Sequence, residues 1–352
     1  MKIGMLTSGG DCQGLNAALR GVAKTLFAAA PEVELIGIQD GYRGLIEGEW
    51  REMNLREFSG ILREGGTILG TSRQAFKSMR EVDDSGEPDR LTKMIKNYKK
   101  EQFDALVILG GNGTHKTAYA LSENGVKVVT LPKTIDNDLY GTDYSFGFDS
   151  AVTKSADVID ALHTTAAAHG RVFVAELMGH KAGWVALHAG LAGGADIILL
   201  PEIPYSTDKV LDVIEKRNQS GKKFSIIAIA EGALTKEEAN TPKKERHSGV
   251  STSGSRLVEE LNARLDQDVR LVIPGHIQRG GDPTPYDRVL CSRFGAKAAE
   301  LILKKKFGYM VALQGTSIIS VPLSEVAGIL KTIPPDCEIV QQARALGVSF
   351  GD

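Results

Sequence analysis

The feature that most constrains the fold is a regular alternation of short apolar runs with helical patterns. Eight runs, rich in aliphatic and β-branched residues, have the length of buried strands. These runs are Ile3–Leu6, Val33–Ile38, Ala105–Leu109, Val126–Thr130, Val172–Leu177, Asp196–Leu200, Ser225–Ala230 and Val269–Ile273. Apolar residues three and four positions apart mark helices between them. The expected helices include Asn16–Ala30, Leu91–Lys100, Thr114–Asn124, Ala151–Ala168 and Thr207–Gln219. The alternation predicts an α/β protein with mostly parallel sheets and ligands beyond the carboxyl ends of the strands.

Composition narrows the class of protein. The 352 residues suffice for two hydrophobic cores, and a formal net charge of -2 gives no overall field for nucleic acid or an anionic membrane. No stretch stays apolar for the ~18 residues of a membrane span, and the N-terminus does not resemble a signal peptide. The three cysteines are far apart, which is typical of a reducing compartment. We therefore expect a cytoplasmic protein with no nucleic-acid or membrane partner.

An unusually polar segment comes just after the strand Val126–Thr130. Pro132–Asp138 reads Pro-Lys-Thr-Ile-Asp-Asn-Asp and combines two carboxylates, an amide, a hydroxyl and an amine. A positioned carboxylate can take the proton of a substrate hydroxyl while neighbouring donors hold an incoming phosphate or sugar. The structural alternative is an Asx-rich turn, in which Asp and Asn cap backbone groups.

Glycines open the first helix directly after the first strand. In Thr7–Asn16, adjacent glycines allow backbone N–H groups to approach an anion at the positive end of a helix. The spacing from Gly9 to Gly14 matches a P-loop, but Leu15-Asn16 replaces its Lys-Ser/Thr pair. The Gly-x-Gly-x-x-Gly of dinucleotide folds is absent as well. The segment is a candidate phosphate cradle, and the alternative is a strand-to-helix turn that uses glycine only for its geometry.

Two more glycine segments point to phosphate. Leu109–Lys116 has a buried strand, a glycine turn and a helix for which Thr114 is the expected N-cap. It predicts a second phosphate cradle. Gly65–Arg73 adds a glycine bend and Arg73, whose forked guanidinium can bind two phosphate oxygens at once.

Three later glycine segments follow strands and carry polar side chains. They are Met178–Trp184, Ala230–Gly232 and Pro274–Gly281. Glu231 could accept hydrogen bonds from sugar hydroxyls, and His276 with Arg279 could hold a sugar phosphate. Between the last two segments, residues 232–255 lack sustained periodicity. They predict an exposed connection. Its basic run, Lys243–Arg246, is expected to be a solvated surface segment, and the alternative is contact with a partner.

In these residues the chain resembles the 6-phosphofructokinases, in particular the subgroup that uses ATP or pyrophosphate. The resemblance extends from Ile3 to beyond Arg288. It is carried by Thr7–Asp11, Gly110–Thr114, Pro132–Asp138, Met178-Gly179, Glu231 and Gly275–Gly281. It implies the two-lobed phosphofructokinase fold with Rossmann-like lobes. The expected donor-binding lobe is residues 1–147 and 278–328, and the expected fructose 6-phosphate-binding lobe is residues 148–277 and 329–352.

The resemblance also implies an activity and roles for residues. The reaction is phosphoryl transfer from ATP to the 1-hydroxyl of fructose 6-phosphate in glycolysis, with Mg²⁺ bridging donor oxygens. Asp136 is the expected base, supported by Thr134 and Asp138. The expected donor-binding residues are Gly10, Tyr42, Arg73, Gly110, Gly111, Asn112, Gly113 and Thr114. The expected sugar-binding residues are Thr134, Asp136, Asp138, Met178, Gly179, His180, Glu231, His276 and Arg279. Arg171 and Arg270 are expected to reach the site of an adjacent subunit in a homotetramer or homodimer.

Three positions depart from the family pattern. Asn112 stands where relatives often have a carboxylate near the metal, so any contact with Mg²⁺ is expected to be weaker or through water. His180 replaces an arginine that stabilises the migrating phosphoryl group, and we expect His180 to act as a cation. Gly113 is typical of ATP users, whereas Lys133, a further catalytic candidate, is typical of pyrophosphate users.

The donor and the rival functions follow from these departures. ATP is the preferred donor, because glycine at 113 leaves room for the α-phosphate, and pyrophosphate is the alternative. Asn112 and His180 also leave open a non-catalytic regulatory paralogue, although the two aspartates, His276 and Arg279 are all present. A third candidate, a dinucleotide-dependent oxidoreductase, fits the fold pattern, but this chain lacks the glycine fingerprint of that class and the candidate comes last.

Overall fold

A computed structural model describes residues 1–79, 88–242 and 251–352. The basic run Lys243–Arg246 therefore lies outside the described residues. The chain divides into two compact units. Unit 1 comprises Met1–Ile135, Leu139–Ser150 and Arg279–Leu330, and unit 2 comprises Asp136–Asp138, Ala151–Gln278 and Lys331–Asp352. Within the described residues, no helix is both long enough and apolar enough to cross a membrane.

Unit 1 is built on one mixed sheet. Its described strands follow the order β11-β10-β5-β4-β1-β2-β3, parallel except for antiparallel edge strands β11 and β3. The strands are β1 (Lys2–Ser8), β2 (Glu34–Ile38), β3 (Trp50–Met53), β4 (Ala105–Gly110), β5 (Val128–Pro132), β10 (Tyr309–Gln314) and β11 (Ser317–Pro322). The central strands β1, β4 and β5 are almost wholly buried, as their continuous apolar runs predict.

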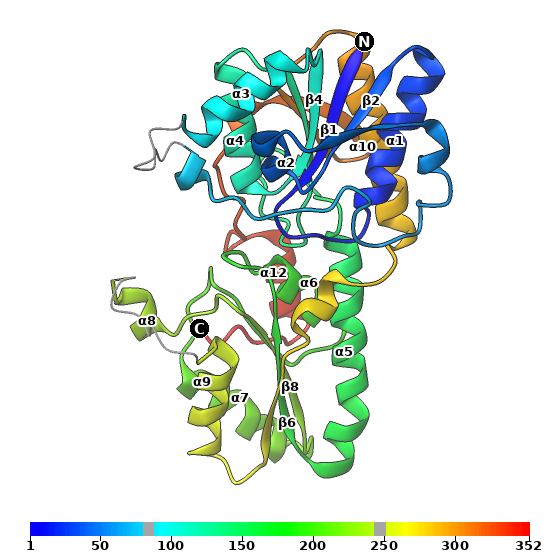
Figure 1. Cartoon of the computed structure of the whole chain (residues 1–352). Coiled ribbons are helices and arrows are strands. Elements are labelled where there is room, and N and C mark those ends of the chain that lie inside the picture. Colours follow the sequence, from blue (N-terminus) through cyan, green and yellow to red (C-terminus); the bar gives the residue numbers. More distant parts are fainter. Residues whose placement is uncertain (80–87, 243–250) are drawn as a thin grey trace. The chain divides into compact units, whose positions relative to one another are not determined.

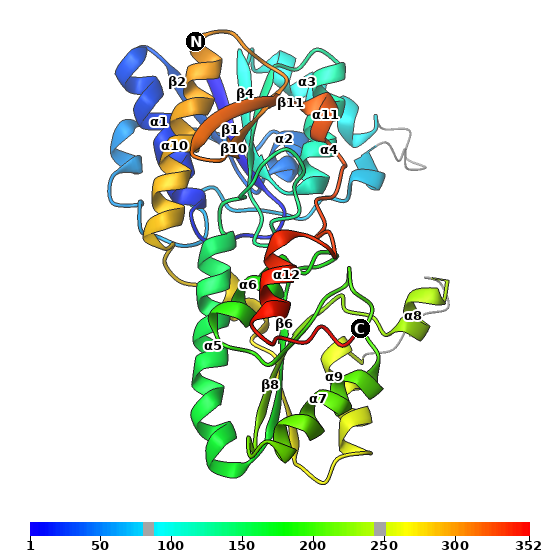
Figure 2. The same cartoon turned by 180° about the vertical axis from the view of Figure 1, so that it is seen from behind.

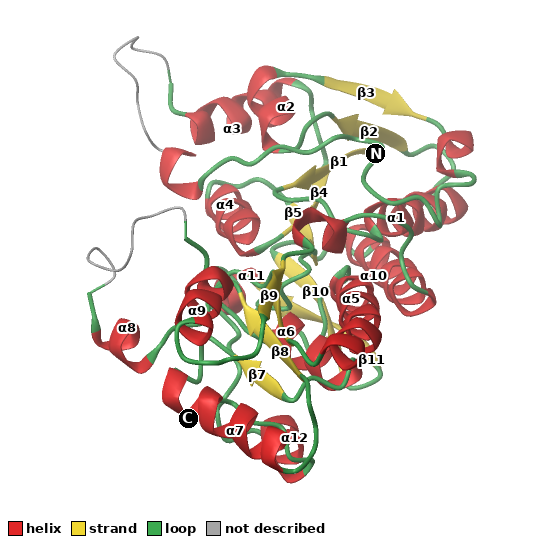
Figure 3. Ribbon diagram, turned by 90° about the horizontal axis from the view of Figure 1, so that it is seen from below, coloured by secondary structure: helices red, strands yellow, loops and turns green. Residues whose placement is uncertain are grey.

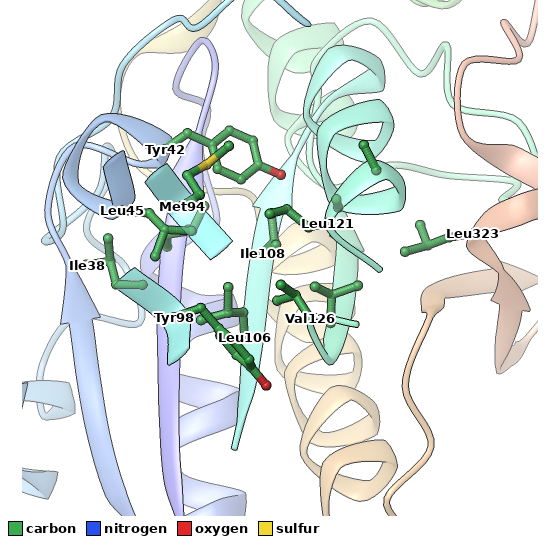
Figure 4. Packing of buried hydrophobic residues seen from close by; sticks show 14 of the residues in the cluster. Ile38, Tyr42, Leu45, Met94, Tyr98, Leu106, Ile108, Leu121, Val126 and Leu323 are labelled. Carbon is green, nitrogen blue, oxygen red and sulfur yellow. The ribbon is translucent and has the colours of Figure 1, made fainter. Parts of the chain in front are cut away.

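Helices cover both faces of this sheet. They are α1 (Leu15–Ala29), α2 (Tyr42–Glu47), α3 (Arg90–Lys100), α4 (Asn112–Glu123), α10 (Pro285–Leu303) and the short α11 (Leu323–Val326). Helices α1 and α10 pack together on one face, and α2, α3 and α4 lie on the other (Figures 1 and 2). Apolar residues of α2, α3 and α4, such as Leu45, Met94 and Leu121, meet Leu106 and Ile108 of β4 in one hydrophobic core (Figure 4).

Unit 2 has a smaller, fully parallel sheet in the order β7-β8-β6-β9. Its strands are β6 (Val172–Leu177), β7 (Ile197–Leu199), β8 (Ser225–Ala230) and β9 (Val269–Val272). Its helices are α5 (Phe148–His169, from Ala151 onward), α6 (Trp184–Ala192), α7 (Thr207–Gln219), α8 (Lys236–Asn240), α9 (Ser253–Asn262) and α12 (Glu338–Ala345). Helices α7 and α9 bury Ile214 and Leu257 against one face of the sheet, and α5 and α6 lie on the other face (Figure 3).

The expected α/β architecture is confirmed. All eight apolar runs contain strands and all five periodic segments are helices, with boundaries shifted by a few residues. The hairpin of β10 and β11 was not specified by the sequence patterns. Strand β11 is a half-buried edge strand, which gives a weaker apolar signal than a central one, whereas β10 is a mostly buried strand that was missed. Mostly parallel strands align their carboxyl ends, which brings the polar segments that follow them to one edge of each sheet.

Candidate active site

Three polar segments of unit 1 begin side by side at the carboxyl ends of β1, β4 and β5. Ser8 pairs with Gly110, and Gly110 pairs with Pro132 in the parallel ladder. The glycine loop after β1, the glycine turn after β4 and the segment from Lys133 therefore start at one level of the sheet. This arrangement follows from the strand order, which places β4 between β1 and β5 although β2 and β3 separate β1 from β4 along the chain.

Lys133 ties these segments together. Its side chain is 3% exposed, its backbone N–H donates to Gly110 O at 3.0 Å, and its ammonium donates to Gly10 O. A Cβ placed on Gly9 would lie 3.4 Å from the Lys133 ammonium. Lys133 is thus a buried positive charge directly against the first glycine loop, where an anion would gain most from it.

The loop Gly65–Arg73 is held against the same place. Asn16 donates to Glu64 O and Gly65 O at 3.2 Å each, and Thr71 Oγ1 donates to Gly9 O at 2.7 Å. The N–H of Gly9 donates in return to Ser72 O at 3.0 Å. These bonds fix the backbone that leads to Arg73.

Two guanidinium groups meet at Gly10. A Cβ on Gly10 would lie 2.9 Å from Arg279 Nη1 and 3.3 Å from Arg73 Nη2, so only glycine leaves this room. Arg279 Nη1 also donates to Asp11 O at 2.9 Å, and its Nε is buried without a hydrogen-bond partner among the described residues. Sequence reasoning expected Arg279 to hold the sugar phosphate. The structure brings its guanidinium beside Arg73, which was expected to contact the donor, and such a pair suits a phosphoryl group.

The second glycine turn opens helix α4 earlier than expected. The N-cap is Gly111 and the helix begins at Asn112, so the expectation that Thr114 caps the helix is wrong. The reason is that Gly111 O accepts both the backbone N–H of His115 at 3.0 Å and the His115 ring Nδ1–H at 2.9 Å. The first N–H groups of α4 therefore belong to Asn112 and Gly113, at the positive end of a helix dipole.

The glycines of this turn differ in the space around them. A Cβ on Gly110 would lie 2.3 Å from the Thr114 side chain, which explains a glycine there by packing alone. A Cβ on Gly113 would meet nothing within 4 Å. Packing therefore does not require a glycine at position 113, which faces open space at the N-terminus of α4.

Tyr42 and Asn112 support the turn from two sides. Tyr42 is 1% exposed, with its ring in the hydrophobic core (Figure 4), and its hydroxyl donates to Thr114 O at 2.8 Å. Asn112 Nδ2 donates to Ile329 O at 3.2 Å, while its Oδ1 is buried and has no hydrogen-bond partner among the described residues. The Tyr42 side chain therefore supports the turn through the backbone of Thr114. Asn112 has an oxygen that could accept a hydrogen bond or contact a cation.

His115 is buried beneath the cradle, and this burial dictates how it responds to pH. Burial, with a smaller contribution from the Lys133 charge, lowers the pKa of His115 from 6.5 to about 4. Below pH 6.5 the unfolded chain binds a proton at His115 that the folded protein does not take up, so stability falls as the pH decreases. The histidine acts as a neutral hydrogen-bond donor to Gly111 O.

We expect the free energy of unfolding of the wild type, relative to a His115→Leu variant, to fall by roughly 2 kcal/mol between pH 7.5 and pH 5. Urea unfolding at the two pH values measures this difference. The matched control is His169→Gln, which replaces an exposed histidine at the end of α5. The free energy of unfolding of the wild type relative to His169→Gln should be the same at both pH values. Equal pH dependence of the wild type and His115→Leu would contradict a buried neutral His115.

The candidate sugar-binding residues of unit 2 are organised around Glu231. Its Oε1 accepts the backbone N–H of Gly179 at 3.2 Å and of His180 at 2.7 Å. His180 has a positive φ of 53° and an exposed side chain. A Cβ on Gly179 would lie 2.5 Å from Ala182 O, so the tight turn requires a glycine. The carboxylate at 231 thus shapes the loop that carries His180.

Gln278 organises the other half of this group. It is fully buried, its Oε1 accepts Ser155 Oγ–H at 2.9 Å and Met178 N–H at 3.2 Å, and its Nε2 donates to Gly275 O at 3.0 Å. These bonds join α5 and Met178 to the 3₁₀ turn Gly275–Arg279, on which the side chain of His276 is exposed. Sequence reasoning gave Gln278 no role, because its partners are distant in the chain.

Arg171 and Arg270 lie together in unit 2. Both bind Asp268 Oδ2 at 2.9 Å, and the three side chains are 29%, 57% and 41% exposed for Arg171, Arg270 and Asp268. Pairing with one shared carboxylate leaves the pair with a net positive charge near the surface. This arrangement is compatible with an anion supplied from outside the chain.

The segment expected to carry the chemistry changes unit along the chain. Thr134 belongs to unit 1 and its carbonyl accepts Ser145 Oγ–H at 2.8 Å, whereas Asp136–Asp138 belong to unit 2. Asn137 and Asp138 are 3% and 6% exposed, while Asp136 is partly exposed. Asn137 has φ 49°, a left-handed conformation that asparagine tolerates better than most residues.

Comparison with known proteins identifies the class and then the family. The structure so far is that of an α/β protein whose unit 1 gathers glycine turns, two arginine side chains and a buried lysine at one edge of its sheet, a combination suited to binding phosphate. The family model described as Phosphofructokinase matches residues 2–302. The chain belongs to the phosphofructokinase family.

Relatives and a solved structure agree with this assignment. The chain is 51% identical to the "ATP-dependent 6-phosphofructokinase" of Spirochaeta thermophila, over 99% of this chain and 97% of that protein. It is 46% identical to the "ATP-dependent 6-phosphofructokinase 3" of Bacteroides thetaiotaomicron, over the full length of both. Among solved structures, Pichia pastoris phosphofructokinase in the T-state superposes with a TM-score of 0.81 at 29% identity. That match covers 93% of this chain and 35% of the yeast chain.

Proposed function

We propose that this protein transfers the γ-phosphoryl group of ATP to the 1-hydroxyl of D-fructose 6-phosphate, giving fructose 1,6-bisphosphate in glycolysis. The observation that carries the proposal is the edge of unit 1, where two glycine segments, two arginine side chains and a buried lysine come together and favour an anion. Relatives at 46% and 51% identity over the whole chain carry the name of this activity.

Unit 1 is the donor-binding lobe in this proposal. The N–H groups at the start of α4 and the loop around Gly10 bind the phosphates, with Arg73 as a further cation and the space at Gly113 left for the α-phosphate. Gly110, Gly111 and Thr114 shape the cradle, and Tyr42 supports it from the core. Lys133 stabilises negative charge on the transferred group.

Unit 2 is the fructose 6-phosphate-binding lobe. Met178, Gly179 and Glu231 line the sugar, while His276 and Arg279 bind the 6-phosphate, as the resemblance implies. Because Arg279 belongs to unit 1 and its guanidinium lies at Gly10, we infer that it also contacts the phosphates of the donor. Arg171 and Arg270 serve an adjacent subunit, which requires a homodimer or homotetramer.

The chemical step is an in-line displacement at the γ-phosphorus. The Asp136 carboxylate takes the proton of the 1-hydroxyl, whose oxygen forms a bond to phosphorus while the bond to the β–γ bridging oxygen breaks and ADP leaves. Thr134 and Asp138 orient the hydroxyl. His180, in its protonated form, stabilises the migrating group.

Mg²⁺ is the metal that this reaction requires, and one buried side-chain oxygen of unit 1 is suited to contact it. Among the described residues no three His, Cys, Asp or Glu side chains gather as a metal site. The buried, unpartnered Oδ1 of Asn112 is the protein oxygen best suited to contact it. When bound, the metal neutralises charge on the donor phosphates.

Lys133 favours pyrophosphate as a second candidate donor, so the proposal is tested by assaying the purified protein with ATP and with pyrophosphate at matched concentrations. We expect kcat/KM with ATP to exceed that with pyrophosphate, because the open position 113 accommodates the α-phosphate. Bisphosphate formation is measured by coupling to aldolase. Turnover with pyrophosphate alone would support the second candidate, and binding of fructose 6-phosphate without turnover by either donor would indicate a regulatory paralogue.

A further inference from the structure

Lys331 contacts the segment of the proposed base through both its backbone and its side chain. Its backbone N–H donates to Asp138 O at 2.8 Å, and its ammonium donates to Asn137 Oδ1 at 3.0 Å. Lys331 is the residue at which the chain returns to unit 2, and Asp136–Asp138 belong to the same unit. The ammonium therefore contacts the residue that lies between the two aspartates in the sequence.

Trp184 holds Lys331 from the other side. The indole Nε1–H donates to Lys331 O at 3.0 Å, and the Lys331 ammonium lies 5.4 Å from the centroid of the indole ring. A cation at this distance from an indole ring is attracted by its π-electrons. One aromatic side chain thus fixes both the backbone and the charge of Lys331.

The start of the helix that carries Trp184 is itself hydrogen-bonded to Glu202. Trp184 is the first residue of α6, whose N-cap residue Gly183 donates its N–H to both oxygens of Glu202 at 3.1 Å. Glu202 also accepts the backbone N–H of Ile333 at 3.0 Å, two residues beyond Lys331. Glu202 therefore joins the start of α6 to the C-terminal segment two residues beyond Lys331.

Asn137 is the part of the turn that most needs such a support. It adopts the left-handed φ of 49° between two acidic residues, and its side chain is 3% exposed. Two carboxylates in one turn repel each other when both are ionised, and a neighbouring ammonium lowers that repulsion. The amide at 137 connects the turn to the ammonium.

We propose that Lys331 is a positioning residue that acts through Asn137 to hold the carboxylate of Asp136 in line with the 1-hydroxyl. The inference rests on the proposed function, because it assigns Lys331 a purpose only if Asp136 is the base. It makes Lys331 a determinant of turnover rather than of substrate affinity, since displacing a reacting group by about 1 Å can cost on the order of 10²-fold in rate.

The first test is Lys331→Met, which retains the aliphatic stem and the backbone N–H but removes the ammonium. We expect kcat to fall by about 10²-fold with ATP, with KM for both substrates and the midpoint of thermal unfolding almost unchanged. Lys306→Met, at an exposed lysine of unit 1, is the matched control and should leave kcat unchanged. A higher KM with unchanged kcat would overturn the proposal, because it would make Lys331 a substrate-binding cation.

Chemical rescue separates charge from packing. A Lys331→Cys variant alkylated with 2-bromoethylamine regains an ammonium on a side chain close to lysine in length, whereas iodoacetamide adds a neutral group. Cys12 and Cys291 are buried, and the partly exposed Cys337 is replaced by serine in all proteins of this test. We expect aminoethylation to restore at least a tenth of the parent kcat and iodoacetamide to restore none. Equal activity of the two adducts would overturn the role of the charge.

Asp136→Asn distinguishes failure of this inference from failure of the proposed function. If Asp136→Asn is inactive while Lys331→Met keeps wild-type kcat, the positioning role is wrong and the proposed function stands. If Asp136→Asn itself retains wild-type turnover, the assigned base is wrong and the role of Lys331 falls with it.

Discussion

Replacing Asp136 with asparagine is expected to lower kcat by about 10³-fold, the largest functional effect of any single change considered for this protein. Asparagine has nearly the same shape and can still accept a hydrogen bond from the 1-hydroxyl, but it cannot take the proton. The partly exposed position of Asp136 beside the buried Asn137 and Asp138 is consistent with access to a substrate. Aldolase-coupled turnover with saturating substrates measures kcat directly.

Two measurements make this result specific. Calorimetric titration with fructose 6-phosphate should give a dissociation constant close to that of the wild type, because the substitution removes a proton acceptor rather than a binding contact. Asp143→Asn is the matched control: Asp143 is exposed and accepts the N–H of Gly315 at 2.7 Å, a bond that an amide oxygen can keep. An Asp136→Asn protein that retains half of wild-type turnover would rule out the carboxylate as the base.

Gly113→Asp is expected to reduce kcat/KM for ATP by on the order of 10²-fold while the fold stays intact. A Cβ at 113 meets nothing within 4 Å, so the protein can accommodate the side chain. A carboxylate in the first turn of α4 is itself favoured by the helix dipole. It would therefore occupy the place, and satisfy the N–H groups, that the proposal assigns to the α-phosphate of ATP, and would repel that phosphate.

Pyrophosphate provides the comparison, since it lacks the group that the new carboxylate opposes. We expect the ratio of kcat/KM for pyrophosphate to that for ATP to rise in Gly113→Asp. The uncharged Gly113→Ala variant, which adds only a methyl group, should lose much less activity with ATP. Equal losses with both donors would mean that the aspartate damages the cradle in general, and unchanged activity with ATP would mean that residue 113 does not face the donor.

The local chemistry of the site was predictable, and its assembly was only partly so. The apolar runs before Ser8, Gly110 and Lys133 predicted three strands with polar segments at their ends, and each is a buried parallel strand. The start of α4 was misplaced by two residues. The His115 ring reinforces the Gly111 carbonyl from within the core, and a capping rule based on neighbouring side chains does not include such a contact.

Residues that act through distant partners left no signal in the chain. Lys331 lies outside every stretch that predicted a strand, a helix or a site, yet it contacts Asn137 and Trp184. Gln278 was noticed only as part of a motif, although its amide joins Met178 to Gly275. The resemblance implied that Arg279 binds the sugar phosphate, but no sequence pattern indicated that its guanidinium lies at Gly10 beside Arg73.

The sequence by itself determined the elements of this protein, the turns that need glycine and the kinds of chemistry available, because these depend on side-chain period and on residues a few positions apart. Tertiary structure alone decided which segments became neighbours: that β4 lies between β1 and β5, that Arg73 and Arg279 meet, and that Lys331 reaches the turn at Asn137. The physical reason is that such contacts arise from the packing of whole strands and helices, whose order in a sheet is set by burial of the entire core rather than by any short stretch of chain.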